Sequence, residues 1–304
     1  MKSYDILILG GGPAGLTAGI YTSRAQLKVG LLEKLMPGGQ VAVTEWVENY
    51  PGFEEGIAGP ELMQRMEKQA RKFGLEIMTG TVTEIELNGD IKKVKTNKEE
   101  YESKAVIITT GTDPKLLNVP GEKKFKGRGV SYCATCDGPF FKDKDIVVVG
   151  GGNSGIQEGL YLTRFVRSIK LVEFMEDLNA EKILQKKAQE NPKFTFYLNH
   201  KVTSINGEQN VTSVSVEDRK TGESKELKAD GVFIWVGMIP NSSFLSEKIK
   251  MDDYGYIITN KKLETSIPGV FAAGDVRKKD IQQIATAVGD GAIAAEFALK
   301  YIEK

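Results

Sequence analysis

The chain has 304 residues, of which 40% are hydrophobic and 27% charged, and its 41 basic residues balance 41 acidic ones. This length exceeds one typical domain and suggests two, each able to bury its own core. A formal net charge of zero gives no broad electrostatic attraction for nucleic acids or anionic membranes, so we expect neither as a partner.

The first residues run directly into a short apolar segment, without the longer apolar core and small-residue cleavage site of a signal peptide. No apolar run approaches the roughly 18 residues of a membrane-spanning helix. We therefore expect a cytoplasmic protein.

The first motif covers residues 6–33. Residues 6–9 (I-L-I-L) are typical of a buried parallel strand, and residues 10–15 (G-G-G-P-A-G) form a complete G-x-G-x-x-G before a predicted helix. A second predicted strand, 28–32, ends in Glu33. This order is a dinucleotide-binding fingerprint, in which the helix N-terminus faces the pyrophosphate and the acid accepts a hydrogen bond from a ribose hydroxyl.

The next segments supply further elements of an α/β fold. Residues 36–53 read as polar and aromatic loops, and residues 60–73 as an amphipathic helix. Residues 74–96 alternate as strands do, with Asn88 and Gly89 as a hairpin turn. A strand at 105–108 then ends in a Thr-Thr-Gly-Thr segment.

Residues 133–139 (C-A-T-C-D-G-P) contain the only two cysteines, Cys133 and Cys136. Their spacing allows a small disulfide ring, and opening it yields a thiol that can attack another disulfide. A zinc site would need four ligands, whereas the chain adds only His200 to the two cysteines, so we expect no metal. A purely structural disulfide closing four residues would stabilise little, which leaves a redox-active dithiol as the favoured interpretation.

The opening pattern then repeats. Residues 146–149 are apolar, residues 150–155 (G-G-G-N-S-G) form a second G-x-G-x-x-G, 156–165 read as a helix, and a strand at 169–172 ends in Glu173. Glu173 follows its glycine motif at the same spacing as Glu33 follows the first. Two fingerprints predict two dinucleotide sites, most economically one for a flavin and one for a nicotinamide.

The remainder alternates a helix at 180–190 with strands, including a buried strand at 230–237. A later buried strand delivers Gly274 and Asp275 at its carboxyl end, where open α/β sheets bind ligands. A helix beginning near Ile284 points its amide dipole towards whatever binds there.

In the order and combination of these motifs, the chain resembles the low-molecular-weight thioredoxin reductases over essentially its whole length. The matching segments are residues 10–15, 38–40, 48–52, 133–137, 150–154 and 265–276. The resemblance implies an α/β protein with two Rossmann-like, three-layer domains, the second inserted in the first. An FAD domain would comprise residues 1–113 and 241–304, and a nicotinamide-type domain carrying the disulfide would comprise 114–240.

The resemblance also implies residue roles. Cys136 would lie nearer the flavin, Cys133 would attack the disulfide of a thioredoxin-like partner, and Asp137 would handle the proton. Such enzymes are usually homodimers. The implied FAD contacts come from Gly10, Gly12, Pro13, Ala14, Gly15, Glu33, Gly39, Gln40, Asn49, Thr110, Gly111, Gly274, Asp275, Gln283 and Ile284. The implied nicotinamide-type site comprises Gly150, Gly152, Asn153, Ser154 and Glu173.

The chain departs from this family at the electron-donor site. NADPH-using relatives follow the second strand with His-Arg-Arg and a further Arg that hold the 2′-phosphate, whereas residues 173–179 here read E-F-M-E-D-L-N. Glu173 would repel that phosphate and accept a bond from an unphosphorylated ribose, which favours NADH over NADPH. A smaller departure is Gln282 before Gln283 and Ile284, where relatives often have Arg.

Other readings stay open at this stage. Electrons could come from reduced ferredoxin or another donor, with the second fingerprint kept as a scaffold, because its glycines also help to pack helix against sheet. A flavin dithiol oxidase would run electrons towards oxygen instead. A redox-silent flavin-binding module or sensor is the alternative from a different class.

Overall fold

The computed structural model describes residues 1–44, 47 and 49–303, without the side chains of Thr135 and Cys136. The chain divides into two compact units. The first unit comprises residues 1–113 and 239–304, and the second unit, residues 114–238, is inserted within it. The second crossing therefore follows residue 238, two residues before the boundary predicted at residue 240.

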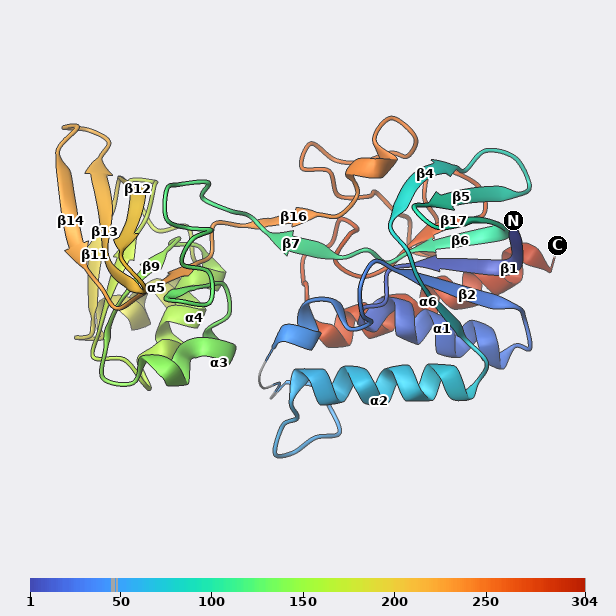
Figure 1. The fold of residues 1–304 in the computed structure, drawn as a ribbon, viewed down its shortest axis with the longest axis horizontal. Coiled ribbons are helices and arrows are strands. Elements are labelled where there is room, and N and C mark those ends of the chain that lie inside the picture. Colours follow the sequence, from blue (N-terminus) through green and yellow to red (C-terminus); the bar gives the residue numbers. More distant parts are fainter. Residues whose placement is uncertain (45–46, 48, 304) are drawn as a thin grey trace. The chain divides into compact units, whose positions relative to one another are not determined.

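The first unit is built on one mixed sheet (Figure 1). Its strands, in pairing order, are β3 (Glu76–Thr79), β2 (Val29–Glu33), β1 (Lys2–Leu9), β6 (Glu100–Ile108), β5 (Lys92–Thr96) and β4 (Val82–Glu86), with β17 (Val270–Ala272) also beside β6. The pairs from β3 to β6, and that of β17 with β6, are parallel. The β4 and β5 pairs are antiparallel. The carboxyl ends of β1, β2, β6 and β17 therefore share one edge.

Both faces of this sheet are buried, which explains the continuous apolar runs seen in the sequence. Ile6 and Ile8 of β1 face a core shared with three helices, which lie along one side of the sheet in Figure 1. Those helices are α1 (Pro13–Arg24), α2 (Gly59–Lys72) and α6 (Ile284–Ile302). Leu7 and Leu9 point to the opposite face, which residues of β4, β5 and the 245–257 segment cover.

The second unit repeats the same plan. Its parallel sheet has, in order, β11 (Phe194–Tyr197), β10 (Ser168–Val172), β9 (Asp145–Val149), β15 (Gly231–Ile234) and β8 (Val130–Ser131). One face packs on α4 (Asn153–Leu162) and α5 (Lys182–Gln189). The other packs on an antiparallel sheet of β12 (His200–Gly207), β13 (Val211–Asp218) and β14 (Ser224–Lys228).

Two short strands connect the units. The chain leaves the first unit through β7 (Thr112–Pro114) and returns through β16 (Met238–Pro240), and these strands pair with each other. The structure confirms the predicted α/β class with one Rossmann-like unit inserted in another. No helix in the part of the chain that the structure describes has the length and apolarity to cross a membrane.

Two predicted elements differ from the structure. The segment predicted as a strand at 230–237 is only Gly231–Ile234, because its partner β9 ends at Val149, where the second glycine turn begins. Within 74–96, β3 pairs with β2 rather than joining the hairpin. The hairpin of β4 and β5 closes over residues 87–91, with Gly89 at φ +82°, and not through a two-residue turn.

Close packing of α1 on α6 predicts opposite effects for two neighbouring glycines. A Cβ on Gly291 would lie 2.3 Å from the carbonyl oxygen of Ala14, whereas one on exposed Gly289 would meet nothing within 4 Å. Gly291→Ala should therefore lower the free energy of unfolding by about 2 kcal/mol. Gly289→Ala, the matched control, should raise it by up to about 1 kcal/mol. Urea unfolding measures both, and equal effects of the two variants would contradict this packing.

Candidate active site

The first glycine turn joins β1 to α1 at the carboxyl edge of the sheet. Gly10 has φ +111°, and a Cβ there would lie 2.5 Å from the carbonyl oxygen of Thr109. A Cβ on Gly15 would lie 2.0 Å from the carbonyl oxygen of Gly10, so this glycine lets the helix pack on the strand end. Gly12 faces open space, with nothing within 4 Å of its Cβ position. The chain is therefore tightly packed behind the turn, whereas the space in front of Gly12 is open. In the first turn of α1, the amides of Ala14 and Gly15 have no acceptor within the helix.

Glu33, at the end of β2, is fixed beside this turn. Its Oε2 accepts a hydrogen bond from the Gly11 amide at 2.8 Å, and its Oε1 accepts one from the Leu35 amide at 3.2 Å. Each carboxylate oxygen can accept a further bond. Glu33 is therefore held in place and can still accept hydrogen bonds from hydroxyl groups of a ligand.

A pocket of about 500 Å³ opens over this edge of the first unit. It is lined by the glycine turn, the ends of β2 and β6, the 39–44 segment, residues 241–244 and the segment before α6. Most of the FAD contacts expected from sequence line it: Gly10, Gly12, Pro13, Ala14, Glu33, Gly39, Gln40, Thr110, Gly111, Gly274, Asp275, Gln283 and Ile284. The structure thus gathers residues that lie up to about 270 positions apart in the chain.

Two expected contacts lie outside the lining. Gly15 serves helix packing, as described above. Asn49 donates from Nδ2 to Oε1 of Gln283 at 3.0 Å, which ties the polar loop to the start of α6. Glu48, in the matching segment 48–52, lies outside the described residues.

Asn241, which was not among the predicted site residues, lines the pocket where the chain returns to the first unit. The Asn241 side chain donates from Nδ2 to the Thr110 carbonyl at 3.1 Å, and the Thr110 hydroxyl donates to the Asn241 carbonyl at 2.7 Å. The Asn241 amide also donates to the Gly111 carbonyl at 2.9 Å. These bonds hold the two crossing segments together at the pocket wall, and no local pattern in the sequence signals them.

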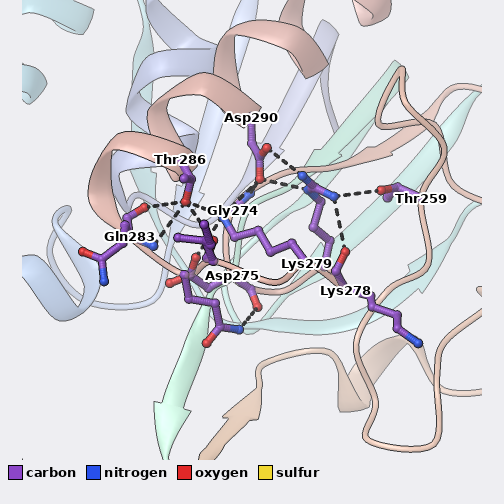
Figure 2. A network of polar contacts seen from close by, with 11 residues as sticks. Thr259, Gly274, Asp275, Lys278, Lys279, Gln283, Thr286 and Asp290 are labelled. Atoms are coloured by element: carbon purple, nitrogen blue, oxygen red, sulfur yellow. Dashed lines mark hydrogen bonds and ion pairs between the residues drawn. The ribbon is translucent and has the colours of Figure 1, made fainter. Parts of the chain in front are cut away.

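Asp275 lies at the end of the segment that follows β17, and Figure 2 shows the polar network around it. Its side chain is 31% exposed and lines the pocket. Its Oδ1 atom is buried and accepts no hydrogen bond from the described residues. The ammonium of Lys279 lies 3.2 Å from that atom and forms an ion pair with it.

Asp290, in the second turn of α6, organises the rest of the network. Its Oδ2 accepts hydrogen bonds from the Gly274 amide at 3.0 Å and from Nε of Arg277 at 2.9 Å. Its Oδ1 accepts from Nη2 of Arg277 at 2.8 Å, and Nζ of Lys279 lies 3.2 Å from Oδ2. The second turn of α6 is thereby joined to the chain segment that carries Asp275.

The two aspartates respond oppositely to burial. Burial raises the pKa of Asp275, the nearby Asp290 raises it further, and Lys279 only partly opposes this. Burial would also raise the pKa of Asp290, but Arg277 and Lys279 together hold that pKa below its ordinary value. The fold therefore favours the charged form of Asp290 and disfavours the charged form of Asp275.

The second glycine turn has the same construction as the first. Glu173, which is 8% exposed, accepts a hydrogen bond on Oε2 from the Gly151 amide and on Oε1 from the Met175 amide, the latter at 2.8 Å. Gly150 has φ +114°, and Gly152 again faces open space. At the start of α4, Asn153 accepts on Oδ1 from the Glu181 amide at 2.7 Å. Ser154 lies exposed in the first turn of α4.

Two basic residues that sequence analysis did not associate with Glu173 reach the loop after it. The Arg219 guanidinium lies 3.7 Å from the centre of the Phe174 ring, and its Nη1 donates to the Phe174 carbonyl at 2.9 Å. Lys220 forms an ion pair with Glu176 at 2.9 Å. Both basic residues come from the turn between β13 and β14, and both are engaged with the loop itself.

The expected dithiol lies in the second unit. Cys133 is disulfide-bonded, and its amide donates to the Ser131 hydroxyl at 3.1 Å. The short helix α3 (Ala134–Asp137) follows, with the Asp137 amide donating to the Cys133 carbonyl at 3.2 Å. Cys136 is the only other cysteine of the chain, and its side chain lies outside the described set.

Replacing Asp290 by Asn should lower the free energy of unfolding by about 3 kcal/mol at neutral pH, because Arg277 and Lys279 lose their shared carboxylate. Since the folded-state pKa of Asp290 lies below 3.8, this contribution is complete above that value and is lost as pH falls through the lowered pKa. Urea unfolding at about pH 7 and about pH 3 should show a large and then a smaller difference from wild type.

The matched control for this variant is Glu296→Gln. Glu296 lies on the same helix, is about half exposed, and pairs with Lys300 at 2.9 Å. Its replacement should change the free energy of unfolding by less than about 0.5 kcal/mol. An equal penalty for D290N at both pH values would contradict the charged network.

Comparison with known proteins agrees with this geometry. Residues 4–291 match the family model described as pyridine nucleotide-disulphide oxidoreductase. A thioredoxin reductase of Bacillus subtilis (strain 168) is 49% identical over 100% of this chain and 96% of its own length. The solved thioredoxin reductase of Lactococcus lactis, in its FR conformation, is 45% identical, with TM-score 0.85 and 99% of each chain covered.

A more distant match is the ferredoxin-flavin thioredoxin reductase of Clostridium acetobutylicum, which is 30% identical, with TM-score 0.55 and 100% and 99% of the two chains covered. The fold, the two glycine turns and the disulfide-bonded Cys133 are those expected of this group. The chain belongs to the pyridine nucleotide-disulphide oxidoreductase family and, within it, to the thioredoxin reductases, and it is an FAD-dependent disulfide oxidoreductase.

Proposed function

We propose that this chain uses NADH to reduce the disulfide of a thioredoxin-like protein, with FAD in the first unit and the dithiol of Cys133 and Cys136 in the second as electron carriers. The observation that carries the proposal is the matched pair Glu33 and Glu173. Glu33 is the last residue of β2 and Glu173 directly follows β10, and each lies beside a glycine turn and is held by two backbone amides. The names of the relatives support the thioredoxin-like acceptor.

The pocket of the first unit fits FAD. The free amides at the start of α1 suit a pyrophosphate, and Glu33 suits the hydroxyls of the adenosine ribose. Asp275 lines the pocket with a carboxylate that is partly exposed, and we assign it to the ribitol chain. We assign the amides of Gln283 and Ile284 to the ring system. When bound, FAD supplies a two-electron carrier between a hydride donor and a disulfide.

The second unit supplies the thiol chemistry. In the reduced enzyme, the thiolate of Cys133 attacks one sulfur of the partner's disulfide, forming a mixed disulfide and releasing the partner's other sulfur as a thiolate. Cys136 then attacks the sulfur of Cys133, which restores the internal disulfide and releases the second partner thiol. The partner gains two electrons and two protons, and we assign to Asp137 the transfer of a proton to the leaving sulfur.

Charge around Glu173 supports NADH over NADPH. Like charges about 4 Å apart near a protein surface repel by about 4 kcal/mol, and a 2′-phosphate beside Glu173 would meet this repulsion. Glu176 and Asp177 add acidic charge to the same loop. Arg219 and Lys220 are the nearby cations, and they already contact Phe174 and Glu176.

Ferredoxin remains the second candidate donor, because a solved ferredoxin-flavin thioredoxin reductase matches the chain over its full length. Its lower identity, 30% against 45% for the Lactococcus enzyme, favours a nicotinamide donor. A homodimer and a cytoplasmic location, where dithiols are kept reduced, complete the proposal.

Replacing either Cys133 or Cys136 by Ser should abolish the reduction of a thioredoxin-like protein, because no mixed disulfide can form or be resolved. FAD should stay bound, since the pocket lies in the first unit. Turnover with thioredoxin and the flavin content of each purified variant measure the two effects. Full activity in either variant would end the proposal.

The donor assignment is tested by Glu173→Gln, which keeps the shape of the side chain and removes its charge. In the wild-type enzyme, kcat/KM for NADH should exceed that for NADPH by more than about tenfold. In E173Q, kcat/KM for NADH should fall about tenfold, and the ratio of the two values should move towards one.

Glu190→Gln is the matched control in the second unit, because Glu190 is 66% exposed and pairs only loosely with Lys186. It should leave the NADH to NADPH ratio unchanged. A wild-type preference for NADPH would contradict the assignment of Glu173. If the enzyme is reduced by ferredoxin and by neither NADH nor NADPH, a nicotinamide nucleotide is not its electron donor.

A further inference from the structure

Lys279 is the buried centre of the polar network beside the pocket (Figure 2). Its side chain is only 7% exposed, whereas that of the adjacent Lys278 is 65% exposed. Burying an ammonium is costly unless it is paired and hydrogen-bonded. Lys279 meets this condition with two carboxylates and one hydroxyl.

The three partners of Lys279 come from two chain segments, the one that follows β17 and the first two turns of α6. Nζ lies 3.2 Å from Oδ1 of Asp275, 3.2 Å from Oδ2 of Asp290, and donates to the Thr286 hydroxyl at 3.1 Å. Thr286 also belongs to the capping box of α6, where its hydroxyl accepts a hydrogen bond from the Gln283 amide at 3.2 Å. One ammonium therefore joins the pocket carboxylate to the first turn of the helix that faces the pocket.

Asp275 and Asp290 differ in how firmly other groups hold them. Asp290 is also fixed by the Gly274 amide and by two nitrogens of Arg277. For Asp275, Lys279 provides the only ion pair within residues 1–44, 47 and 49–303, and its Oδ1 has no hydrogen bond there. Without the ammonium, the partly buried carboxylate of Asp275 would lose its ion pair and would lie near the buried carboxylate of Asp290 with no cation between them.

We propose that Lys279 is a positioning residue for FAD, which holds the Asp275 carboxylate through an ion pair so that it is turned towards the ribitol chain. The inference rests on the proposed FAD site and deepens it. Lys279 holds the buried Oδ1 atom, so that the exposed part of the carboxylate is left for the ligand. The same ammonium fixes the spacing between Asp275 and the N-terminus of α6.

The test uses the full-length protein after removal of flavin, titrated with FAD while flavin fluorescence is followed. K279M should weaken FAD binding about tenfold, because the ammonium that forms an ion pair with the Asp275 carboxylate is lost. K279R, which keeps the charge, should restore most of the affinity. K278M, the matched control at the neighbouring exposed position, should bind FAD as wild type does.

A double-mutant cycle separates positioning from general stability. If Lys279 acts through Asp275, the double variant K279M/D275N should bind FAD no more weakly than D275N alone, within about twofold. If Lys279 only stabilises the fold, the losses of FAD affinity in K279M and in D275N should multiply in the double variant. The melting temperature of each flavin-free variant is recorded alongside, and K279Q replaces K279M if the latter does not fold.

Several outcomes would overturn the inference. Wild-type affinity in K279M, or multiplied losses in the double variant, would exclude a positioning role for Lys279 while leaving the proposed reductase intact. A wild-type protein that binds no FAD would overturn the proposed function together with this inference.

Discussion

The structure depends on a hydrogen bond between the amide of a glycine turn and the glutamate that ends the next strand. In the first unit Gly11 donates to Glu33, and in the second Gly151 donates to Glu173. A Cβ on Gly151 would lie 2.8 Å from the glutamate oxygen, so a side chain there would disturb the contact. This single constraint places a carboxylate and a helix N-terminus at a fixed separation, which is the geometry that a dinucleotide needs.

The two units use this device in different surroundings. In the first unit, chain segments before and after the insertion form a pocket beside the glycine turn, and Asp275 is among the residues that line it. In the second unit, a hairpin turn brings Arg219 and Lys220 against an acidic loop. We propose that the charge beside each glutamate, rather than the shared fold, decides which nucleotide each unit accepts.

Much of this could be predicted from the sequence because the signals are local. Each glycine turn, its flanking apolar strands and its terminal acid lie within about 30 residues, and the structure places them as expected. Lys279 could not be predicted, because residues 277–280 (R-K-K-D) read as an exposed charged turn. Its burial depends on the ion pair with Asp290, which lies eleven positions later in the chain, in the second turn of α6.

Arg219 illustrates the same limit at longer range. The first residue of β12, His200, lies beside Glu173, because its amide donates to the Glu173 carbonyl at 2.9 Å. In the antiparallel pair of β12 and β13, His200 lies opposite Asp218. Arg219 follows Asp218 and therefore reaches the loop after Glu173. That register brings residue 219 beside a loop more than forty positions earlier in the chain. A motif read in isolation cannot reveal such a neighbour, and the end of β15 likewise depends on where β9 ends.

The central claim is that electrons enter from an unphosphorylated nicotinamide nucleotide and reach the dithiol through a bound flavin. Anaerobic titration of the purified yellow protein with NADH, NADPH and reduced ferredoxin in parallel, while flavin absorbance is recorded, tests this most directly. We predict that NADH bleaches the flavin and that more than one equivalent is consumed, because the disulfide also accepts electrons. Bleaching by micromolar NADPH, or no bleaching by either nucleotide, would contradict the account.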